Sequence, residues 1–377
     1  MKTTVQVQTA KRVPIFAVYV SERAIERAVA TLRSGYIGDG PVVREFEAQV
    51  AQFTQARHAV AVNSGTSALS LALALAGVGP DDEVVTTAQT FVATSHVILA
   101  RGARPVYADV QYLTGNIDPG DIPRRITSRT KAILPVHWAG YPCDMDEILA
   151  VADQRGLPVI EDAAQALGAT YHGRPIGSLP TVACFSFQAV KQLTTVDGGM
   201  LCTQDDDAAE SARRRRWFGI DRAKRRPTLL GEPAWDITEP GYKYHMNDVA
   251  AALGTAHMDE LSTIHARLGQ IDARYRDALA DVPGLTLFDA APDREGAFFT
   301  FCVHVERRDD FAHAVRSRGV DASVVHLRID TNTVFGPLRT DLPQLDRLTE
   351  TMICLPLHYR LTDDDVDDVI DAVRTGW

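Results

Sequence analysis

Residues 184–200 have the sequence CFSFQAVKQLTTVDGGM, which predicts a buried strand, a polar turn and a second strand. The turn carries one lysine, Lys191, and the second strand begins at Met200 after a Gly-Gly pair. An amine at the end of a buried strand is partly desolvated, so its pKa falls and it becomes a usable nucleophile. Such a lysine can form an imine with an aldehyde cofactor. Because most lysines are solvated surface charges, this interpretation depends on the rest of the chain.

Residues 58–75 predict an anion-binding turn between a strand and a helix. The run HAVAV at 58–62 is short and apolar, as in a buried strand, and residues 68–75 have strong helical propensity. The turn between them holds Ser64, Thr66 and Ser67. Free N–H groups and the positive end of the helix dipole would point at a ligand there, and the hydroxyls suit a phosphate monoester. An ordinary capped helix is the alternative.

Residues 157–165, LPVIEDAAQ, predict a strand that ends in two carboxylates. Ligands of α/β sheets bind beyond the carboxyl ends of the strands. A carboxylate at that place could keep a pyridine nitrogen protonated, which makes the ring of pyridoxal 5'-phosphate (PLP) an electron sink. Gln165 could hydrogen-bond the phenolic oxygen of the same ring. The alternative is that the acidic pair only caps the next helix.

Together these motifs resemble the sugar aminotransferases of the DegT/DnrJ/EryC1/StrS family, a branch of the fold-type I PLP enzymes. The resemblance runs from about Pro14 to the C-terminus and includes the stretches TFVAT at 90–94, PVH at 135–137 and FSF at 185–187. It implies an α/β fold with a large mixed-sheet domain and a smaller C-terminal α+β domain. We place the PLP-binding domain, with its N-terminal arm, at residues 1–255 and the small domain at residues 256–377.

The resemblance also implies roles for individual residues. Lys191 would be the catalytic lysine that holds PLP as an imine, and Asp162 would pair with the pyridine nitrogen. Gln165 would contact the ring oxygen, and Phe91 would lie against the ring face. The phosphate would be held by three residues, Gly65, Thr66 and Ser186. Certain family members replace the catalytic lysine with histidine and become dehydratases, so Lys191 favours transamination.

Three further residues are candidates for contacts at the edge of the site. Lys243 stands where many relatives have an asparagine that reaches across a homodimer to the neighbour's cofactor phosphate, so the resemblance implies active sites shared between subunits. His326 and Arg328 lie in a predicted substrate-lining loop and could bind a hydroxyl or a phosphate. A His-x-Arg pattern alone is a weak signal.

Composition limits the possible partners of the 377-residue chain. Its net charge of −10 argues against nucleic-acid binding. The five cysteines form no Cys-x-x-Cys pair, so neither a metal site nor a disulfide framework is expected. Residues 1–6 lack an apolar signal core and no run is long enough to span a bilayer, so we expect a cytoplasmic protein without membrane contact. Basic runs at 213–216 and 222–226 are either a solvated surface or a site for a nucleotide diphosphate.

The expected function is amination of a nucleotide-linked keto-deoxysugar, with L-glutamate as the amino donor. The stretch GYKYHM at 241–246, followed by AAALG at 250–254, favours C4 of a dTDP-4-keto-6-deoxyhexose. A 3-keto sugar or a keto-cyclitol is the alternative substrate. A protein that binds PLP or a sugar nucleotide without turnover is the alternative from another class.

Overall fold

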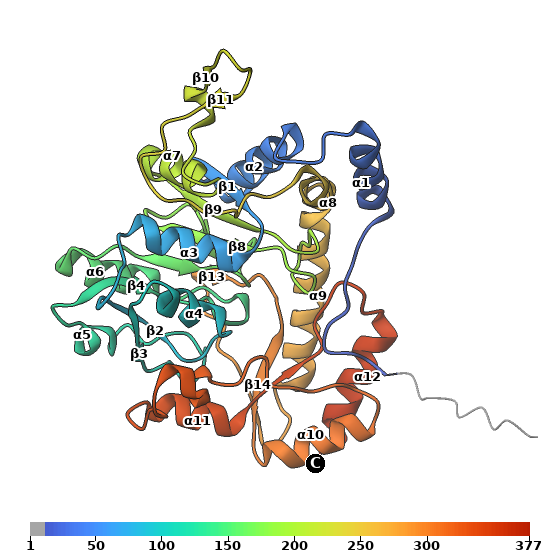
Figure 1. Cartoon of the computed structure of the whole chain (residues 1–377). Helices are drawn as coiled ribbons and strands as arrows, with labels where there is room; N and C mark the ends of the chain where they lie inside the picture. The colour runs from blue at the N-terminus through green and yellow to red at the C-terminus, as the bar shows by residue number, and fades with distance from the viewer. Residues whose placement is uncertain (1–11) are drawn as a thin grey trace, which may run out of the picture.

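A computed structural model describes residues 12–377; the N-terminal residues 1–11, which include the segment expected to lack a signal core, lie outside the described residues. The largest element is a seven-stranded mixed sheet in the first part of the chain (Figure 1). Two hydrogen-bonded groups of strands are joined into this sheet by the parallel bridges Ile133–Val159 and Val136–Asp162. Among the described residues, β9 is the one strand of the sheet that runs antiparallel. The strands, in spatial order, are β1 (His58–Val62), β9 (Gly199–Thr203), β8 (Val182–Ser186), β5 (Ile160–Asp162), β4 (Thr130–Leu134), β2 (Glu83–Thr87) and β3 (Arg104–Ala108).

Helices cover both faces of this sheet, which explains why its strands are mostly apolar. Alternate residues of β1 enter different cores, with Ala59 and Ala61 on one face and Val60 and Val62 on the other. The first face packs against α2 (Pro41–Thr54), α5 (Ile122–Arg125) and α6 (Met145–Arg155). The second packs against α3 (Gly65–Leu75), α4 (Ala93–Ala100) and α7 (Asp206–Arg215).

The C-terminal part of the chain builds a smaller antiparallel sheet with its own core. Its strands are β12 (Leu285–Leu287), β14 (Phe301–Val305) and β15 (Met352–Leu355), with β14 in the middle. The core contains Tyr275, Val303 and Phe311. The helices are α9 (Leu261–Leu279), α10 (Arg308–Ser317), α11 (Pro343–Thr351) and α12 (Asp363–Arg374). The expected α/β class, with a mixed sheet followed by a smaller α+β unit, agrees with this architecture.

Several segments cross between the two units. Residues 13–20, expected as part of the large domain's arm, lie on the small unit: Val13 bridges Val320, and the ring centroids of Tyr19 and Tyr359 are 4.7 Å apart. In the other direction, β13 (Arg294–Glu295) pairs with β6 (Thr170–Tyr171), beside β7 (Arg174–Pro175). The chain passes from one unit to the other after α8 (Asp248–Met258), which packs on α1 (Glu22–Ser34) and α2. The boundary between residues 255 and 256 remains a prediction.

A hairpin of β10 (Arg226–Pro227) and β11 (Pro233–Ala234) projects from the body of the molecule (Figure 1). The remaining short elements are the 3-10 turns η1 (Trp138–Gly140), η2 (Arg222–Lys224), η3 (Ile329–Thr331) and η4 (Thr333–Phe335). Within residues 12–377, no helix has the length and apolar character needed to cross a bilayer.

Candidate active site

A cavity of about 360 Å³ lies at the carboxyl ends of the central strands, where the large sheet meets the small unit. This is the position at which α/β sheets bind their ligands. The cavity brings together most of the residues predicted for the site. Those that line it are Gly65, Thr66, Phe91, Asp162, Gln165, Ser186, Lys191 and His326.

Lys191 reaches the cavity from the loop after β8. Its Nζ lies 4.2 Å from the centroid of the Phe299 ring. Burial lowers the pKa of the Lys191 amine to about 8, against the opposing attraction of the Asp162 carboxylate. At pH 7 about a tenth of the amine is therefore neutral, far more than for a solvated lysine, and the neutral amine is the nucleophilic form.

Asp162 is the last residue of β5 and is 5% exposed. Its Oδ2 accepts a hydrogen bond of 2.7 Å from the Thr94 hydroxyl, and its Oδ1 accepts one of 3.2 Å from the Ala164 N–H. Burial raises the pKa of the Asp162 carboxyl, although both hydrogen bonds favour the charged form. A buried carboxylate of this kind gains from a partner that carries N–H⁺, such as a pyridinium.

Gln165 is oriented by the backbone of a neighbouring loop. Its Oε1 accepts a hydrogen bond of 2.7 Å from the Ala139 N–H. Because the acceptor end of the amide is used in this way, the Nε2 end is left to donate into the cavity. This orientation suits a contact with a phenolic oxygen.

The turn before α3 forms a narrow cradle at the other end of the cavity. Ser64 caps the helix, and its Oγ accepts a hydrogen bond from the Ser67 N–H at 3.1 Å. A Cβ added to Gly65 would lie 2.8 Å from the Cβ of Ser186, so only glycine leaves space here. A helix N-terminus with hydroxyl groups around it binds phosphate. The cradle, the carboxylate and the lysine therefore fit the phosphate, ring nitrogen and aldehyde of PLP.

Aromatic side chains form the rim and wall of the cavity. The Phe91 ring is 52% exposed, and its centroid lies 4.9 Å from that of His326. Burial, together with the nearby Lys191, lowers the pKa of His326 to about 4, which leaves its ring neutral at pH 7. Phe299 and Phe16 also line the cavity, and the sequence analysis missed both. No local motif marks them, because each comes from a segment far along the chain from the cofactor motifs.

Two predicted site residues do not line this cavity. Lys243 is exposed, and its backbone carbonyl accepts a hydrogen bond of 3.4 Å from Asn63 Nδ2. Arg328 is 6% exposed, and its guanidinium binds Asp330 through two hydrogen bonds of 2.7 Å and also pairs with Asp346. In this arrangement two carboxylates hold the guanidinium, and moving it would leave the buried Asp330 charge unpaired, so the expected substrate contact of Arg328 stays a prediction.

Comparison with known proteins agrees with this geometry. The sequence profile of the DegT/DnrJ/EryC1/StrS aminotransferase family matches residues 19–374. The chain belongs to this family. Its similarity to the spore coat polysaccharide biosynthesis protein SpsC of Bacillus subtilis strain 168 is 40% identity over 367 residues, which covers 94% of each chain.

Solved structures show the same relationship. The sugar aminotransferase CalS13 from Micromonospora echinospora is 36% identical and superposes with a TM-score of 0.92 over 97% of this chain and 100% of its own. The PLP form of Spr1654 from Streptococcus pneumoniae is 29% identical, with a TM-score of 0.90 over 97% of this chain and 98% of its own; its PMP form is also solved. The chain is thus a PLP-dependent sugar aminotransferase with the fold-type I architecture, which sets aside the non-catalytic alternative.

Proposed function

We propose that this enzyme transfers an amino group from L-glutamate to C4 of a dTDP-4-keto-6-deoxyhexose. The observation that carries the proposal is the single cavity shared by Lys191, Asp162 and the cradle at Gly65 in a sugar aminotransferase. The name of SpsC places that relative in polysaccharide biosynthesis, and CalS13 is described as a sugar aminotransferase. A nucleotide-linked keto sugar is a substrate class consistent with both names.

The cavity residues divide the work of amino transfer. When bound, PLP supplies an electron sink that stabilises the negative charge developing at the donor's α-carbon. The Asp162 carboxylate stabilises positive charge on the ring nitrogen, and the Gly65 turn holds the phosphate. Lys191, with a pKa of about 8, accepts a proton as the neutral amine and returns it as the ammonium. The same residues run the reverse sequence when the amino group passes to the keto sugar.

The basic cluster at residues 213–226 is the proposed contact for the nucleotide diphosphate, and its ion pairs limit which cations are available. Arg214 and Arg215 pair with Glu239, whereas Arg216 pairs with Glu47. In the following run, Arg222 pairs with Asp39 and Lys224 with Asp221. Within the described part of the chain, the cations of this cluster for which no ion pair is found are Arg213, Arg225 and Arg226. We assign the diphosphate to Arg225 and Arg226, since paired donors on arginine match phosphate oxygens.

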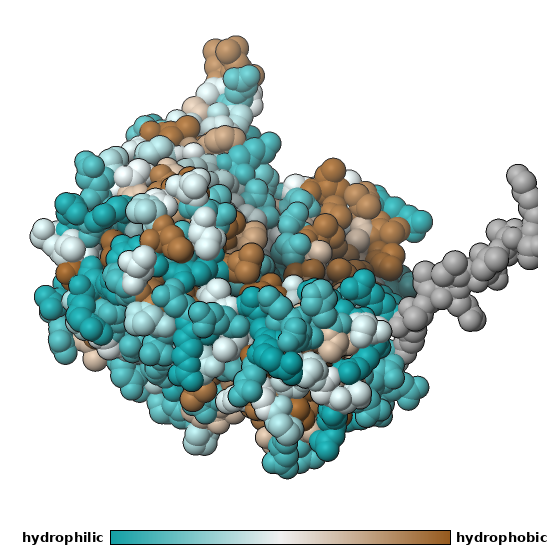
Figure 2. All heavy atoms as spheres, turned by 90° about the horizontal axis from the view of Figure 1, so that it is seen from below, coloured by the Kyte–Doolittle hydropathy of each residue, from teal (hydrophilic) through white to brown (hydrophobic). Residues whose placement is uncertain are grey.

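Two exposed apolar surfaces support a homodimer. One is the outer face of α1, where Ile25 is 44% and Leu32 55% exposed. The other is the tip of the projecting hairpin, where the side chains of Leu229 and Leu230 are almost fully exposed. Figure 2 shows apolar atoms both on the side where α1 lies and at the end of the hairpin. Exposed apolar patches of this kind mark interaction sites, and in a homodimer the hairpin and Lys243 would serve the partner's active site.

Position C4 is supported by the family-like stretches at 241–246 and 250–254, the second of which lies on α8. A 3-keto sugar or a keto-cyclitol remains the alternative substrate. Incubation with glutamate and a panel of nucleotide-linked 3-keto and 4-keto sugars and keto-cyclitols, followed by mass spectrometry and NMR, separates these possibilities. We expect the amine at C4 of the dTDP-linked sugar. Amination of only a 3-keto sugar or a keto-cyclitol would contradict C4, and the absence of transfer to any nucleotide sugar would contradict the whole proposal.

A further inference from the structure

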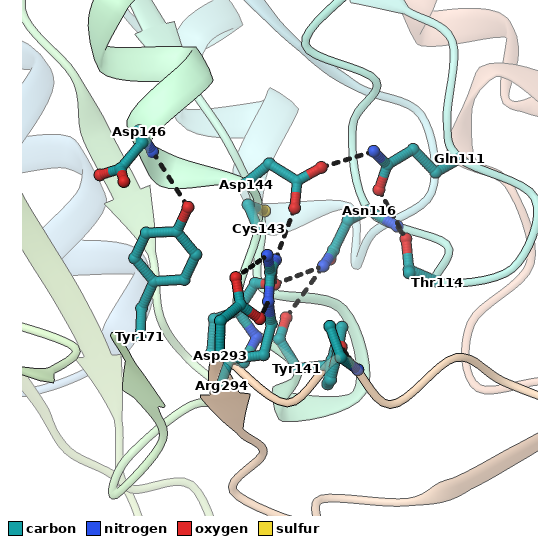
Figure 3. Close-up of polar contacts among 12 residues, drawn as sticks. Gln111, Thr114, Asn116, Tyr141, Cys143, Asp144, Asp146, Tyr171, Asp293 and Arg294 are labelled. Carbon is teal, nitrogen blue, oxygen red and sulfur yellow. Dashed lines mark hydrogen bonds and ion pairs between the residues drawn. The ribbon is translucent and has the colours of Figure 1, made fainter. Parts of the chain in front are cut away.

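A buried arginine outside the cofactor cavity joins the two units of the molecule. Arg294, the first residue of β13, has a side chain only 8% exposed. Its Nη1 donates to Asp144 Oδ1 at 2.6 Å and to the Pro142 carbonyl at 3.1 Å, and its Nε and Nη2 each donate to Asp293 at 2.8 Å. Its guanidinium carbon lies 4.8 Å from the centroid of the Tyr171 ring. Figure 3 shows how these groups converge on the arginine.

The same cluster holds the loop of residues 137–144. The Asn116 amide donates to the Tyr141 and Pro142 carbonyls, both at 3.0 Å, and accepts from the Trp138 N–H at 2.8 Å. Gln111 donates to the second oxygen of Asp144 at 2.6 Å (Figure 3). The loop is therefore fixed by the hydrogen bonds of Asn116 and, at its C-terminal end, by the contacts of Asp144 with Arg294 and Gln111.

Within this loop, Ala139 has a backbone conformation that needs support. Its φ is +55°, in the left-handed region that residues with a Cβ rarely adopt. Strained residues of this kind persist only where the surrounding structure holds them, and they concentrate at functional sites. The Ala139 N–H is the group that donates to Gln165 Oε1 and so turns the Gln165 amide toward the cavity.

The segment that follows Arg294 runs beside the same loop and ends in the cavity wall. The Ala297 N–H donates to the Gly140 carbonyl at 2.9 Å, and the Phe299 N–H donates to the Ala139 carbonyl at 3.2 Å. Arg294 thus holds two segments in place. One is the segment that carries Phe299, and the other is the loop that orients Gln165.

We propose that Arg294 is a positioning residue of the cofactor site: it holds the 137–144 loop in the strained conformation at Ala139, which keeps the Gln165 Nε2 directed at the ring oxygen of PLP. The inference rests on the role assigned to Gln165 above. A purely structural arginine would change the stability of the fold and leave cofactor binding unaltered, so the two roles are separable by experiment.

The test is a double-mutant cycle on the dissociation constant of PLP, measured by equilibrium dialysis with cofactor-free protein. We expect Arg294→Met to raise the dissociation constant about fivefold to tenfold, and Gln165→Ala to raise it by a similar factor. If Arg294 acts through Gln165, Arg294→Met should add less than about twofold in the Gln165→Ala background. Arg294→Lys keeps the charge but loses the paired donors, so it should show most of the loss.

Arg125→Met is the matched control. Arg125 also connects the large unit to the small one: it donates hydrogen bonds to Asp121 at 2.7 Å and to the Asp341 carbonyl at 3.0 Å. None of these three residues lines the cavity. This variant should lose thermal stability and keep its affinity for PLP. Should Arg294→Met fail to fold, Arg294→Lys and Asp144→Asn replace it in the cycle.

The inference is overturned if Arg294→Met weakens PLP binding by the same factor in the wild-type and the Gln165→Ala backgrounds. It is also overturned if folded Arg294 and Asp144 variants bind PLP with unchanged affinity. An unchanged affinity in Gln165→Ala alone would overturn it as well. Amino transfer by the unaltered enzyme tests the proposed function independently, so a failure of one does not imply a failure of the other.

Discussion

Lys191 Nζ lies 4.2 Å from the centre of the Phe299 ring, across the seam between the large sheet and the small unit. An aromatic face attracts a cation and so favours the charged amine, by about 0.5–2 kcal/mol. Burial acts in the opposite direction and prevails, since the pKa of Lys191 falls to about 8. The small unit therefore completes the wall around the reactive amine.

The first prediction concerns the identity of the reactive lysine. Borohydride should fix PLP covalently to the protein, and the labelled peptide should contain Lys191. Lys191→Ala should still bind pyridoxamine phosphate but lose catalytic proton transfer. A label on another lysine, or substantial multiple turnover by the variant, would refute the assignment.

The second prediction is a pH dependence of cofactor uptake. Because the neutral amine attacks the aldehyde, the rate at which cofactor-free enzyme takes up PLP should rise by about tenfold per pH unit below the pKa. With a Lys191 pKa of about 8, the rise should level off above pH 8. Stopped-flow absorbance measures this rate. A rate that keeps climbing toward pH 10 would indicate an ordinary, solvated lysine.

The third prediction concerns Asp162. Asp162→Asn keeps the size of the side chain and removes the charge that stabilises the ring nitrogen. A charged hydrogen bond contributes roughly 1.5–3 kcal/mol, so both half-reactions should slow by at least about tenfold. Thr94→Val, which removes the 2.7 Å hydrogen bond to the same carboxylate, serves as a graded control with a smaller loss. Single-turnover rates that match the wild type in both half-reactions would disprove the role, whatever the cofactor affinity.

The fourth prediction is that Lys243 acts on the partner's cofactor phosphate. Mixing Lys191→Ala with Lys243→Ala gives heterodimers in which one site carries both lesions and the other carries none. Activity should recover toward about half of normal per heterodimer, because a charge-assisted contact to phosphate is restored in one site. If mixed dimers form and stay inactive, Lys243 works within its own subunit or has no role.

The fifth prediction concerns stability. Glu83, at the start of β2, is fully buried; burial raises its pKa, but hydrogen bonds from Thr127, Arg104 and Arg129 outweigh this and lower it to about 2. Folding lowers this pKa from 4.5 to about 2, so the ionised carboxylate stabilises the fold at pH values above 4.5. This contribution to stability is lost as the pH falls toward 2. Glu83→Gln should lower the free energy of unfolding by roughly 2–3 kcal/mol at pH 7.

The Glu83 prediction is checked by denaturant unfolding at several pH values. The difference between Glu83→Gln and the wild type should shrink between pH 4.5 and pH 2. Asp363→Asn is the control, because this carboxylate is 71% exposed and pairs with Arg267 and Arg274 on the surface. A control that destabilises as much as Glu83→Gln would show that burial is not the cause.

Sequence patterns alone predicted the cofactor site where its parts are local. Three short stretches of sequence each indicate a strand that is followed directly by polar residues. They are the turn at Gly65, the strand end at Asp162 and the loop at Lys191. Because strands of an α/β sheet end at a common edge, three such local signals predict one shared cavity. The family resemblance gave these residues roles, and the structure places all three in one cavity.

Contacts between remote segments were decided only by the tertiary structure. Phe299 reaches the cavity on the segment that follows β13, the strand that carries Arg294 and pairs with β6, and no nearby residue in the sequence indicates this. Arg328 has a suitable charge for a substrate contact, but the packing of α11 brings Asp346 to it and removes it from the cavity. Periodicity reports the local backbone and burial of a segment. The partner of a charge, and hence its pKa and availability, depends on which distant group the fold places within a few ångströms.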